Sequence, residues 1–442
     1  MERTYLKDLP NLVGSTVKIV GFAENQREQS AKLTFVDLRD ISGKVQCVAY
    51  NLEGSENMRD VTLESVIEIV GLVKARPEKA VKADQQLGAF EIEVKEYKLL
   101  SKSEGLPLQI NSKAQNEAEA DTRMDFRWLD LRRPEKLLTF KVWTELERAM
   151  VEYWTANNYM EIHSPKILGA PSETGAEVFE VKYFDRTAYL AQSPQFYKQM
   201  AMAAGFEKVF EIGSVFRAEN SNTIRHTTEF TGYDAEISYI DSHLDVMTEE
   251  EKLITFAIQK VVEKYGEEIK RVMEIELKVP TMPFPKMTMV EAKAVLAKLG
   301  IKSEKEGDLS SEEEKALGNY VETELHHDFI FVTDYPIEVR PFYHMRHEDN
   351  PKLTKSFDLM YKGIEITTGA QREHRYEKLV EQAKEKGMNI ELIQFYLDFF
   401  RYGMPPHGGL GMGPSRLLMR MLGLESIRES MFVFRNPRRL NP

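Results

Sequence analysis

Alternating apolar and polar positions predict short β-strands in the first part of the chain. The pattern, rich in β-branched residues, recurs in five segments: 17–22, 32–38, 44–50, 66–73 and 90–94. Asp40-Ile-Ser-Gly43 is a turn sequence between the second segment and the third. Such closely spaced strands predict a small closed barrel, and the OB-fold is the commonest candidate with five strands. A β-domain that binds no ligand fits the same pattern equally well.

Polar sequence without hydrophobic periodicity follows the predicted barrel and divides the chain. We predict an N-terminal domain at residues 1–105, a linker or hinge at 106–130 and a C-terminal domain at 131–442. Within the C-terminal domain, residues 287–325 predict two helices, because a capping-box sequence precedes each helical pattern. Their charged residues indicate a solvated insertion, to which we assign no chemistry.

Residues 208–239 predict a long β-hairpin with one apolar face. Phe210, Ile212 and Phe216 fall on that face, because side chains alternate along a strand. The other face collects four charged side chains, namely Arg217, Glu219, Asp234 and Glu236. Ion pairs on a solvated face would explain this pattern, but the long connection at 220–229 favours ligand binding.

A glycine-rich segment at residues 407–413 precedes a predicted helix. Pro414 suits the first turn of that helix, and Gly423 suits the position just beyond its end. Glycines before a helix let backbone amides approach an anion, and Arg416 is placed to reach a phosphate. The segment matches neither the dinucleotide-binding fingerprint nor the P-loop.

Composition and charge restrict the class of protein further. The 442 residues include 59 Lys and Arg against 71 Asp and Glu, a net charge of −12, so nucleic-acid binding needs local basic patches. The single cysteine, Cys47, excludes an internal disulfide and a thiolate zinc site. The sequence has no apolar run as long as a membrane span and no signal-peptide pattern at its start. We therefore expect a cytoplasmic protein without membrane attachment.

Three segments resemble the motifs of class II aminoacyl-tRNA synthetases. Phe216-Arg-Ala-Glu219, continued by residues 222–226 and 229–236, resembles motif 2. Residues 409–416 resemble motif 3. The helix before Ser164-Pro165-Lys166 resembles motif 1, whose proline lies at the dimer interface.

Further segments are similar to one family within this class, the aspartyl-tRNA synthetases in their compact archaeal and eukaryotic-like form. These segments are 172–175, 192–198, 357–358 and 365–372. Three positions depart from the family pattern. Ser415 stands where motif 3 usually has a glutamate, Thr368 where a serine is usual, and Asn436 where an aspartate is usual.

The resemblance implies an α+β fold, with an N-terminal OB-fold that binds the anticodon and an antiparallel catalytic sheet of roughly six or seven strands. It implies a homodimer that ligates L-aspartate to tRNA-Asp through an aspartyl-adenylate, with ATP as substrate and Mg²⁺ as the metal. Charging of tRNA-Asn as a second tRNA stays open. The alternatives are an asparaginyl-tRNA synthetase and a catalytically silent RNA-binding relative.

The resemblance also assigns an ATP site. Its residues are Arg217, Glu219, His226, Phe230, Glu365 and Arg416. We expect Arg217, Arg416 and Glu365 to carry the catalysis, because adenylyl transfer needs charge neutralisation more than a protein nucleophile. Phe230 stacks on the adenine. Glu365 binds magnesium with Thr368 as its hydroxyl partner, since Mg²⁺ prefers hard oxygen ligands.

By the same resemblance, aspartate binds to five residues: Glu173, Gln195, Lys198, Asp234 and Arg372. Arg372 and Lys198 hold the side-chain carboxylate, whereas asparagine would turn its NH2 group toward these cations. Asp234 and Glu173 receive the α-ammonium, and Gln195 donates to the α-carboxylate. Lys198 favours aspartate, because asparaginyl enzymes typically lack this lysine.

Three residues of the N-terminal domain are assigned to the anticodon. Phe35 stacks on a base, while Gln46 and Glu91 read base edges, as aromatic and polar groups do on OB-folds. Strand alternation leaves open whether Phe35 belongs to the core instead. It also leaves open whether Glu91 or Glu93 is the reader.

Overall fold

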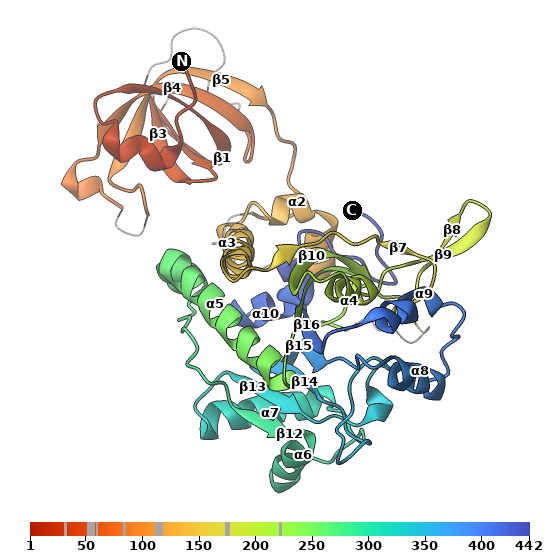
Figure 1. Ribbon diagram of the computed structural model, residues 1–442. Helices are drawn as coiled ribbons and strands as arrows, with labels where there is room; N and C mark the ends of the chain where they lie inside the picture. Colours follow the sequence, from red (N-terminus) through yellow and green to blue (C-terminus); the bar gives the residue numbers. More distant parts are fainter. Residues whose placement is uncertain are drawn as a thin grey trace. The chain divides into compact units, whose positions relative to one another are not determined.

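A computed structural model divides the chain into two compact units, Met1–Leu129 and Asp130–Pro442 (Figure 1). We call them the N-terminal unit and the C-terminal unit. The structure describes residues 1–30, 33–50, 58, 61–82, 85–110, 118–172, 177–220 and 223–442. Each unit has a hydrophobic core of its own.

The N-terminal unit contains a closed five-stranded barrel, as the alternating pattern predicts. The strand order is β1-β2-β3-β5-β4, with β1 (Thr16–Ser30), β2 (Leu33–Asp40), β3 (Gly43–Tyr50), β4 (Val66–Ala75) and β5 (Phe90–Ser101). The predicted turn between β2 and β3 is confirmed, because Oδ1 of Asp40 accepts hydrogen bonds from the amides of Ser42 (2.7 Å) and Gly43 (3.1 Å). Short helices accompany the barrel: η1 (Leu6–Asn11), η3 (Glu78–Ala80) and α1 (Ala120–Asp125).

An eight-stranded sheet forms the centre of the C-terminal unit, in the order β12-β13-β14-β15-β16-β11-β10-β6. Its strands are β6 (Met160–Glu161), β10 (Lys208–Phe216), β11 (Glu229–Ser238), β12 (Lys286–Thr288), β13 (Phe329–Thr333), β14 (Ser356–Tyr361), β15 (Ile364–Gln371) and β16 (His407–Met412). The inner pairs are antiparallel, whereas the short edge strands β12 and β6 pair in parallel. The sheet is therefore wider than the resemblance implies and is mixed at its edges. A second, three-stranded sheet contains β7 (Ile167–Leu168), β9 (Arg186–Leu190) and β8 (Glu180–Tyr183).

Helices surround the large sheet. They are α3 (Pro134–Ala156), α4 (Gln195–Ala203), α5 (His243–Met273), α6 (Met289–Lys298), α7 (Ser311–Glu324), α8 (Tyr376–Glu385), α9 (Gln394–Leu397) and α10 (Pro414–Met421). Helix α2 (Arg127–Asp130) spans the boundary between the two units in the sequence. Both predicted capping boxes are present, at the starts of α6 and α7. Among the described residues, no helix combines the length and the hydropathy of a membrane-crossing segment.

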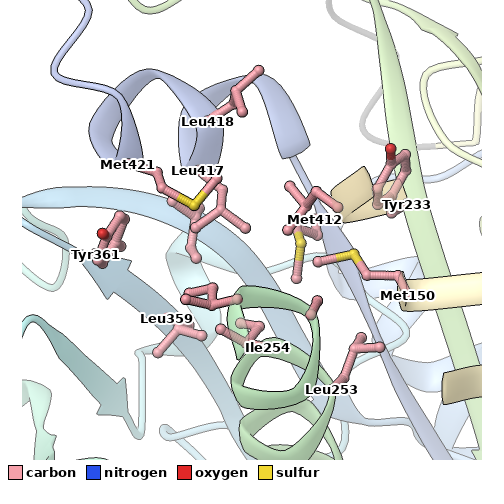
Figure 2. Close-up of a cluster of buried hydrophobic side chains, with 14 of the residues drawn as sticks. Met150, Tyr233, Leu253, Ile254, Leu359, Tyr361, Met412, Leu417, Leu418 and Met421 are labelled. Carbon is pink, nitrogen blue, oxygen red and sulfur yellow. The ribbon is translucent and has the colours of Figure 1, made fainter. Parts of the chain in front are cut away.

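The main core of the C-terminal unit lies between one face of the sheet and helices α3, α5 and α10. Figure 2 shows Met150 of α3, Leu253 and Ile254 of α5, and Leu417 of α10 turned toward the side chains of the sheet. Each of these four side chains is at most 2% exposed. This helix-covered face holds the sheet rigid and leaves the opposite face for a binding site.

Candidate active site

The face of the sheet opposite α3 and α5 carries a cavity of about 240 Å³. Phe230, Gly232 and Asp234 of β11 line it, whereas Tyr233 and Ala235, at alternate positions of the same strand, belong to the helix-covered core. The predicted polar face of the hairpin is therefore the floor of the cavity. The lining also includes residues of α4, α10, β15, β16, the connection between β10 and β11, and the segment 341–344.

Strand register aligns polar groups in one row across this floor. Asp358 of β14 pairs with Thr368 of β15, Thr368 with Gly411 of β16, and Gly411 with Asp234 of β11. A Cβ on Gly411 would lie 3.2 Å from Oδ1 of Asp234, so a side chain there would crowd the carboxylate. The glycine keeps the row open between its two acidic groups.

Two buried cations and two buried carboxylates form one ion-pair cluster: Lys198, Asp234, Glu236 and Arg372. Nζ of Lys198 donates to Oδ1 of Asp234 (2.8 Å) and to the carbonyl oxygen of Leu410 (3.0 Å). It also lies 3.4 Å from Oε2 of Glu236. Three protein oxygens thus surround the ammonium group of Lys198. The charge of Lys198 is therefore balanced mainly by groups of the protein itself.

Arg372 forms the other half of the ion-pair cluster. Its Nε and Nη2 donate to the two carboxylate oxygens of Glu236 at 2.9 and 3.3 Å. Burial favours protonation of Glu236, but the charges of Arg372 and Lys198 outweigh it and lower its pKa. Nη1 of Arg372 lies 3.0 Å from Nε2 of His344, whose pKa falls well below its usual range through burial. These contacts use three of the five N–H groups of Arg372, and the guanidinium lines the cavity.

The glycine-rich segment has a different role from the one expected. It forms β16, whose backbone pairs with β11 and β15 on its two sides, so its amides do not present themselves to an anion. A Cβ on Gly409 would lie 2.1 Å from Oε2 of Glu236. Only glycine at this position leaves room for the buried Glu236–Arg372 pair. Gly423 does follow α10 with a φ of +59°, as predicted.

A chain of hydrogen bonds determines the orientation of the Gln195 amide. His407 Nδ1 lies 2.8 Å from the carbonyl oxygen of Pro405, which can only accept, so Nδ1 carries the proton. Burial lowers the pKa of His407 to about 4, so its Nε2 is an acceptor and receives Nε2 of Gln199 at 2.8 Å. Oε1 of Gln199 then accepts from Nε2 of Gln195 (2.8 Å) and from the Tyr396 hydroxyl (2.8 Å). Gln195 is thereby oriented with its carbonyl oxygen free to face the cavity.

Three arginines line another part of the cavity: Arg217, Arg225 and Arg416. We call them the arginine cluster. Nη1 of Arg416 donates to the backbone oxygen of Glu365 (3.0 Å) and lies 3.4 Å from its Oε1. Burial opposes ionisation of Glu365, but Arg416 and other arginines outweigh it and hold its pKa below the usual range. Arg217 lies 5.7 Å over the ring of Phe230.

His226 and Glu219 line the cavity together with the arginine cluster. Nε2 of His226 lies 3.8 Å from Oε2 of Glu219, and its Nδ1 lies 2.6 Å from the Thr223 hydroxyl. Burial lowers the pKa of His226 more than Glu219 raises it. His226 is therefore neutral near pH 7 and can donate one hydrogen bond.

A β-bulge brings Glu365 and Thr368 to one face. Met360 pairs with Glu365 but Leu359 pairs with Thr367, so Ile366 is an additional residue in β15. In a regular strand, residues three apart would point to opposite faces. Thr368 pairs directly with Asp358, and its hydroxyl donates to Oδ1 of Asp358 (2.8 Å). The bulge lets the same hydroxyl approach Oε1 of Glu365 (3.4 Å).

Asp358 and Arg340 form an ion pair next to Thr368. Nη2 of Arg340 lies 2.7 Å from Oδ2 of Asp358, and its guanidinium stacks 3.6 Å over the ring of Tyr335. Oδ1 of Asp358 remains directed toward Thr368. Oδ1 of Asp358 and Oε1 of Glu365 thus both approach the Thr368 hydroxyl. Thr368 and Glu365 line the cavity, and Glu365 is 35% exposed there. Within the described ranges, no three His, Cys, Asp or Glu side chains form a metal site by themselves.

The cavity collects nearly all the residues predicted for ATP and amino-acid binding. They are Gln195, Lys198, Arg217, Glu219, His226, Phe230, Asp234, Glu365, Thr368, Arg372 and Arg416. Glu173 lies outside the described residues. Sequence reasoning gave no role to Arg340, His344 or Asp358, and only the Phe357-Asp358 match pointed toward one of them. Glu236 stood on the predicted polar face but was not assigned to the site.

The residues predicted to read the anticodon lie on the outer surface of the barrel. Phe35 is half-buried there, while its neighbour Val36 belongs to the core, so Phe35 is not a core residue. Gln46 pairs directly with Glu91, whereas Glu93 pairs with Val48 and forms an ion pair with Lys74. Glu91 and Glu93 share one face, and Glu91 is the neighbour of Gln46.

Comparisons with known proteins extend over nearly the whole chain. Residues 119–436 match the family described as class II tRNA synthetases (D, K and N), and residues 17–100 match the OB-fold nucleic acid binding domain. The aspartate–tRNA(Asp/Asn) ligase of Aeropyrum pernix is 42% identical, over 98% of this chain and 97% of the relative. The aspartate–tRNA(Asp) ligase of Pyrococcus furiosus is 41% identical, with 98% and 97% coverage. The asparaginyl-tRNA synthetase of Pyrococcus horikoshii, solved with asparaginyl-adenylate, is 31% identical and superposes with a TM-score of 0.91 over 100% of both chains.

Proposed function

This chain belongs to the class II aminoacyl-tRNA synthetases, and from that premise we propose that it is an aspartate–tRNA ligase. An oxygen of the aspartate α-carboxylate attacks the α-phosphorus of ATP, the bond to the β-phosphate breaks, and pyrophosphate leaves. The terminal ribose hydroxyl of the tRNA then attacks the carbonyl carbon, and AMP leaves. The two more similar relatives are aspartate ligases, which disfavours the asparaginyl alternative.

The buried Arg372 is the observation that carries the choice of aspartate. Its unused N–H groups offer a fork to a side-chain carboxylate, and the surrounding ion-pair cluster holds that fork in place. The side-chain NH2 group of asparagine would face the N–H groups of Arg372. Both are hydrogen-bond donors, so one polar group would remain unpaired. Such mismatches cost about 1–3 kcal/mol each in buried sites, more where charge is involved. Lys198 supports Asp234 and Glu236 and adds positive charge beside the fork.

The orientation of Gln195 changes its proposed role. Because its NH2 group donates to Gln199, the carbonyl oxygen is the group that faces the cavity. A carbonyl accepts from an ammonium and repels a carboxylate. We therefore assign Gln195, together with Asp234, to the α-ammonium of aspartate rather than to its α-carboxylate.

The arginine cluster is proposed to bind the triphosphate of ATP. Arg217 stabilises the charge that grows at the α-phosphate, and Arg416 holds the far end of the chain of phosphates. His226 adds one hydrogen-bond donor. Phe230, at the edge of this region, provides a flat apolar surface for the adenine.

Glu365, Asp358 and Thr368 fit the needs of Mg²⁺, because their oxygens converge beside the arginine cluster. Mg²⁺ usually takes one or two carboxylates and completes its shell with phosphate and water oxygens. When bound, the ion would neutralise phosphate charge and orient the phosphates. We add Asp358 to this set because strand pairing places it next to Thr368.

The N-terminal unit is proposed to bind the tRNA anticodon. Phe35, Gln46 and Glu91 lie on one outer surface of an OB-fold, a surface that stacks and reads bases in such domains. A homodimer is proposed as well. Exposed Met160 and Ile167 flank Pro165, the proline of the motif 1 resemblance, and would be covered by a second copy.

Aspartate-dependent exchange of pyrophosphate into ATP tests the proposal. We expect exchange with aspartate to exceed exchange with asparagine by a factor of at least about 100. Lys198→Leu should reduce exchange with aspartate while leaving binding of α,β-methylene ATP unchanged. Faster exchange with asparagine would refute the assignment. Charging of purified tRNA-Asp and tRNA-Asn then decides which tRNAs are substrates.

A further inference from the structure

We infer that the helical insertion completes the ATP site: Glu314 of α7 is a positioning residue that holds Arg225 toward the triphosphate. The inference rests on the proposed function and extends it to a segment with no assigned chemistry. Its starting point is one contact between distant parts of the chain. Nη1 of Arg225 lies 2.5 Å from Oε2 of Glu314, although 89 residues separate them in sequence.

The two partners differ in how firmly they are held. Glu314 is 5% exposed and lies on a helix, whereas Arg225 is 21% exposed and belongs to the connection between β10 and β11. Arg225 lines the cavity with Arg217 and Arg416. The side-chain hydrogen bond that the structure gives Arg225 goes to Glu314. We therefore infer that Glu314, held firmly on the helix, fixes the position of the Arg225 side chain on the connection.

Helix α7 is itself seated closely on the catalytic sheet. A Cβ on Gly318 would lie 2.4 Å from the backbone of Gly363, in the turn between β14 and β15. Gly363 comes two residues before Glu365, the proposed magnesium ligand. The N-terminus of α7 is also capped, since Ser310 and Glu313 form both hydrogen bonds of a capping box. One rigid helix thus contacts both the arginine cluster and the strand that carries Glu365.

The ion pair joins a buried carboxylate to a partly exposed arginine. Burial raises the pKa of Glu314, and Arg225 opposes that shift, so the carboxylate depends on this partner. Arg225 lines the cavity together with Arg217 and Arg416, which are proposed to bind the triphosphate. The orientation of the Arg225 guanidinium therefore affects the binding of ATP.

A double-mutant cycle on nucleotide binding tests the inference. We would titrate Glu314→Gln, Arg225→Ala and the double variant with α,β-methylene ATP and Mg²⁺, without amino acid. Because a charge-assisted hydrogen bond is lost, each single change should weaken binding about 10-fold. The double variant should also lose only about 10-fold, since Glu314 acts through Arg225. Independent losses that multiply to about 100-fold, or wild-type affinity in Glu314→Gln, would overturn the inference.

Two further variants separate positioning from folding. Glu291→Gln removes the capping-box carboxylate of α6, in the same insertion, and should lower stability without changing nucleotide affinity. Equal weakening in Glu291→Gln and Glu314→Gln would refute positioning. Glu314→Asp keeps the charge but withdraws it by one methylene, and should bind with intermediate affinity. A wild-type chain that binds the analogue but shows no aspartate-dependent exchange would refute the proposed function and leave this inference standing.

Discussion

The two ends of the cavity are built on opposite principles. At the ion-pair cluster, charges are buried and matched within the protein; Arg372 is 3% exposed and Glu236 is fully buried. At the arginine cluster, charged groups stay partly open, and Glu365 is 35% exposed. A buried, paired cluster presents one fixed polarity to a small ligand. An open cluster leaves its charges to be balanced by the ligand and its metal.

The elements that supply each end explain this difference. Lys198 comes from α4 and Glu236 from β11, which is paired with a strand on each side at this residue, so neighbouring backbone holds the side chain firmly. Arg217 and Arg225 come from the connection after β10, and Glu365 from a bulge. We therefore expect substitutions at the buried end to reduce activity and stability together. Substitutions at the open end should reduce activity alone.

Arg372→Leu should have the largest effect. It leaves Glu236 buried without its main counter-charge, and breaking a buried pair costs about 3–5 kcal/mol of folding free energy. Loss of the carboxylate fork should also lower aspartate-dependent pyrophosphate exchange by about 1,000-fold. Urea unfolding and exchange assays measure the two effects. Arg401→Ala is the control, because Arg401 is 51% exposed. An Arg372→Leu protein of wild-type stability would contradict the view of a matched buried cluster.

Arg217→Ala should lower adenylate formation by a factor of about 100 or more, because one donor to a developing charge is worth about 3 kcal/mol. The free energy of unfolding should not change, since the side chain is exposed in the cavity. Single-turnover adenylate formation and urea unfolding measure these quantities. Arg186→Ala, an exposed arginine outside the cavity, should behave as wild type. A stability loss in Arg217→Ala would remove the contrast between the two ends.

Glu365→Gln should raise the Mg²⁺ concentration for half-maximal exchange by about 10-fold, because a neutral amide is a weaker ligand than a carboxylate. Saturating Mg²⁺ should restore much of the rate. A Mg²⁺ titration of the exchange reaction measures this shift, with exposed Glu381→Gln as the matched control. An unchanged titration would exclude Glu365 as a ligand.

Phe35→Ala tests a surface separate from the cavity. Loss of one base stack, worth about 1–3 kcal/mol, should raise the KM for tRNA about 10-fold. Pyrophosphate exchange, which needs no tRNA, should stay at the wild-type rate. Tyr5→Ala is the control, because Tyr5 is an exposed aromatic residue of the N-terminal unit. Equal losses in both assays would indicate a folding defect instead.

The smallest effect is expected in the pH dependence of aspartate binding. The pKa of His407 is about 4 in the folded protein and about 6.5 unfolded. The folded chain thus binds fewer protons between these values, so the contribution of His407 to stability is complete above pH 6.5 and falls toward pH 4. The KM for aspartate should stay level from pH 8 down to about pH 5.5, because Gln199 keeps its acceptor. A rise in KM near pH 6.5 that His407→Gln abolishes would contradict the neutral histidine.

Local pattern was sufficient for much of the fold. Period-two alternation identified the barrel strands and the polar face of the hairpin, because alternation follows from strand geometry alone. Capping boxes located α6 and α7 through contacts only three residues apart. The residues that line the cavity were found through motif resemblance, which carries residue identity but not contacts.

The contacts themselves were decided by tertiary structure. Glu365 and Thr368 meet only because pairing with β14 creates a bulge at Ile366. The orientation of the Gln195 amide depends on His407, which contacts Gln199 although 208 residues separate these two in sequence. Strand register and helix packing bring these groups together across large sequence separations, and hydrogen-bond direction depends on the partner found there. The sequence therefore determined which groups are available, and only packing determined which atoms each of them offers to a ligand.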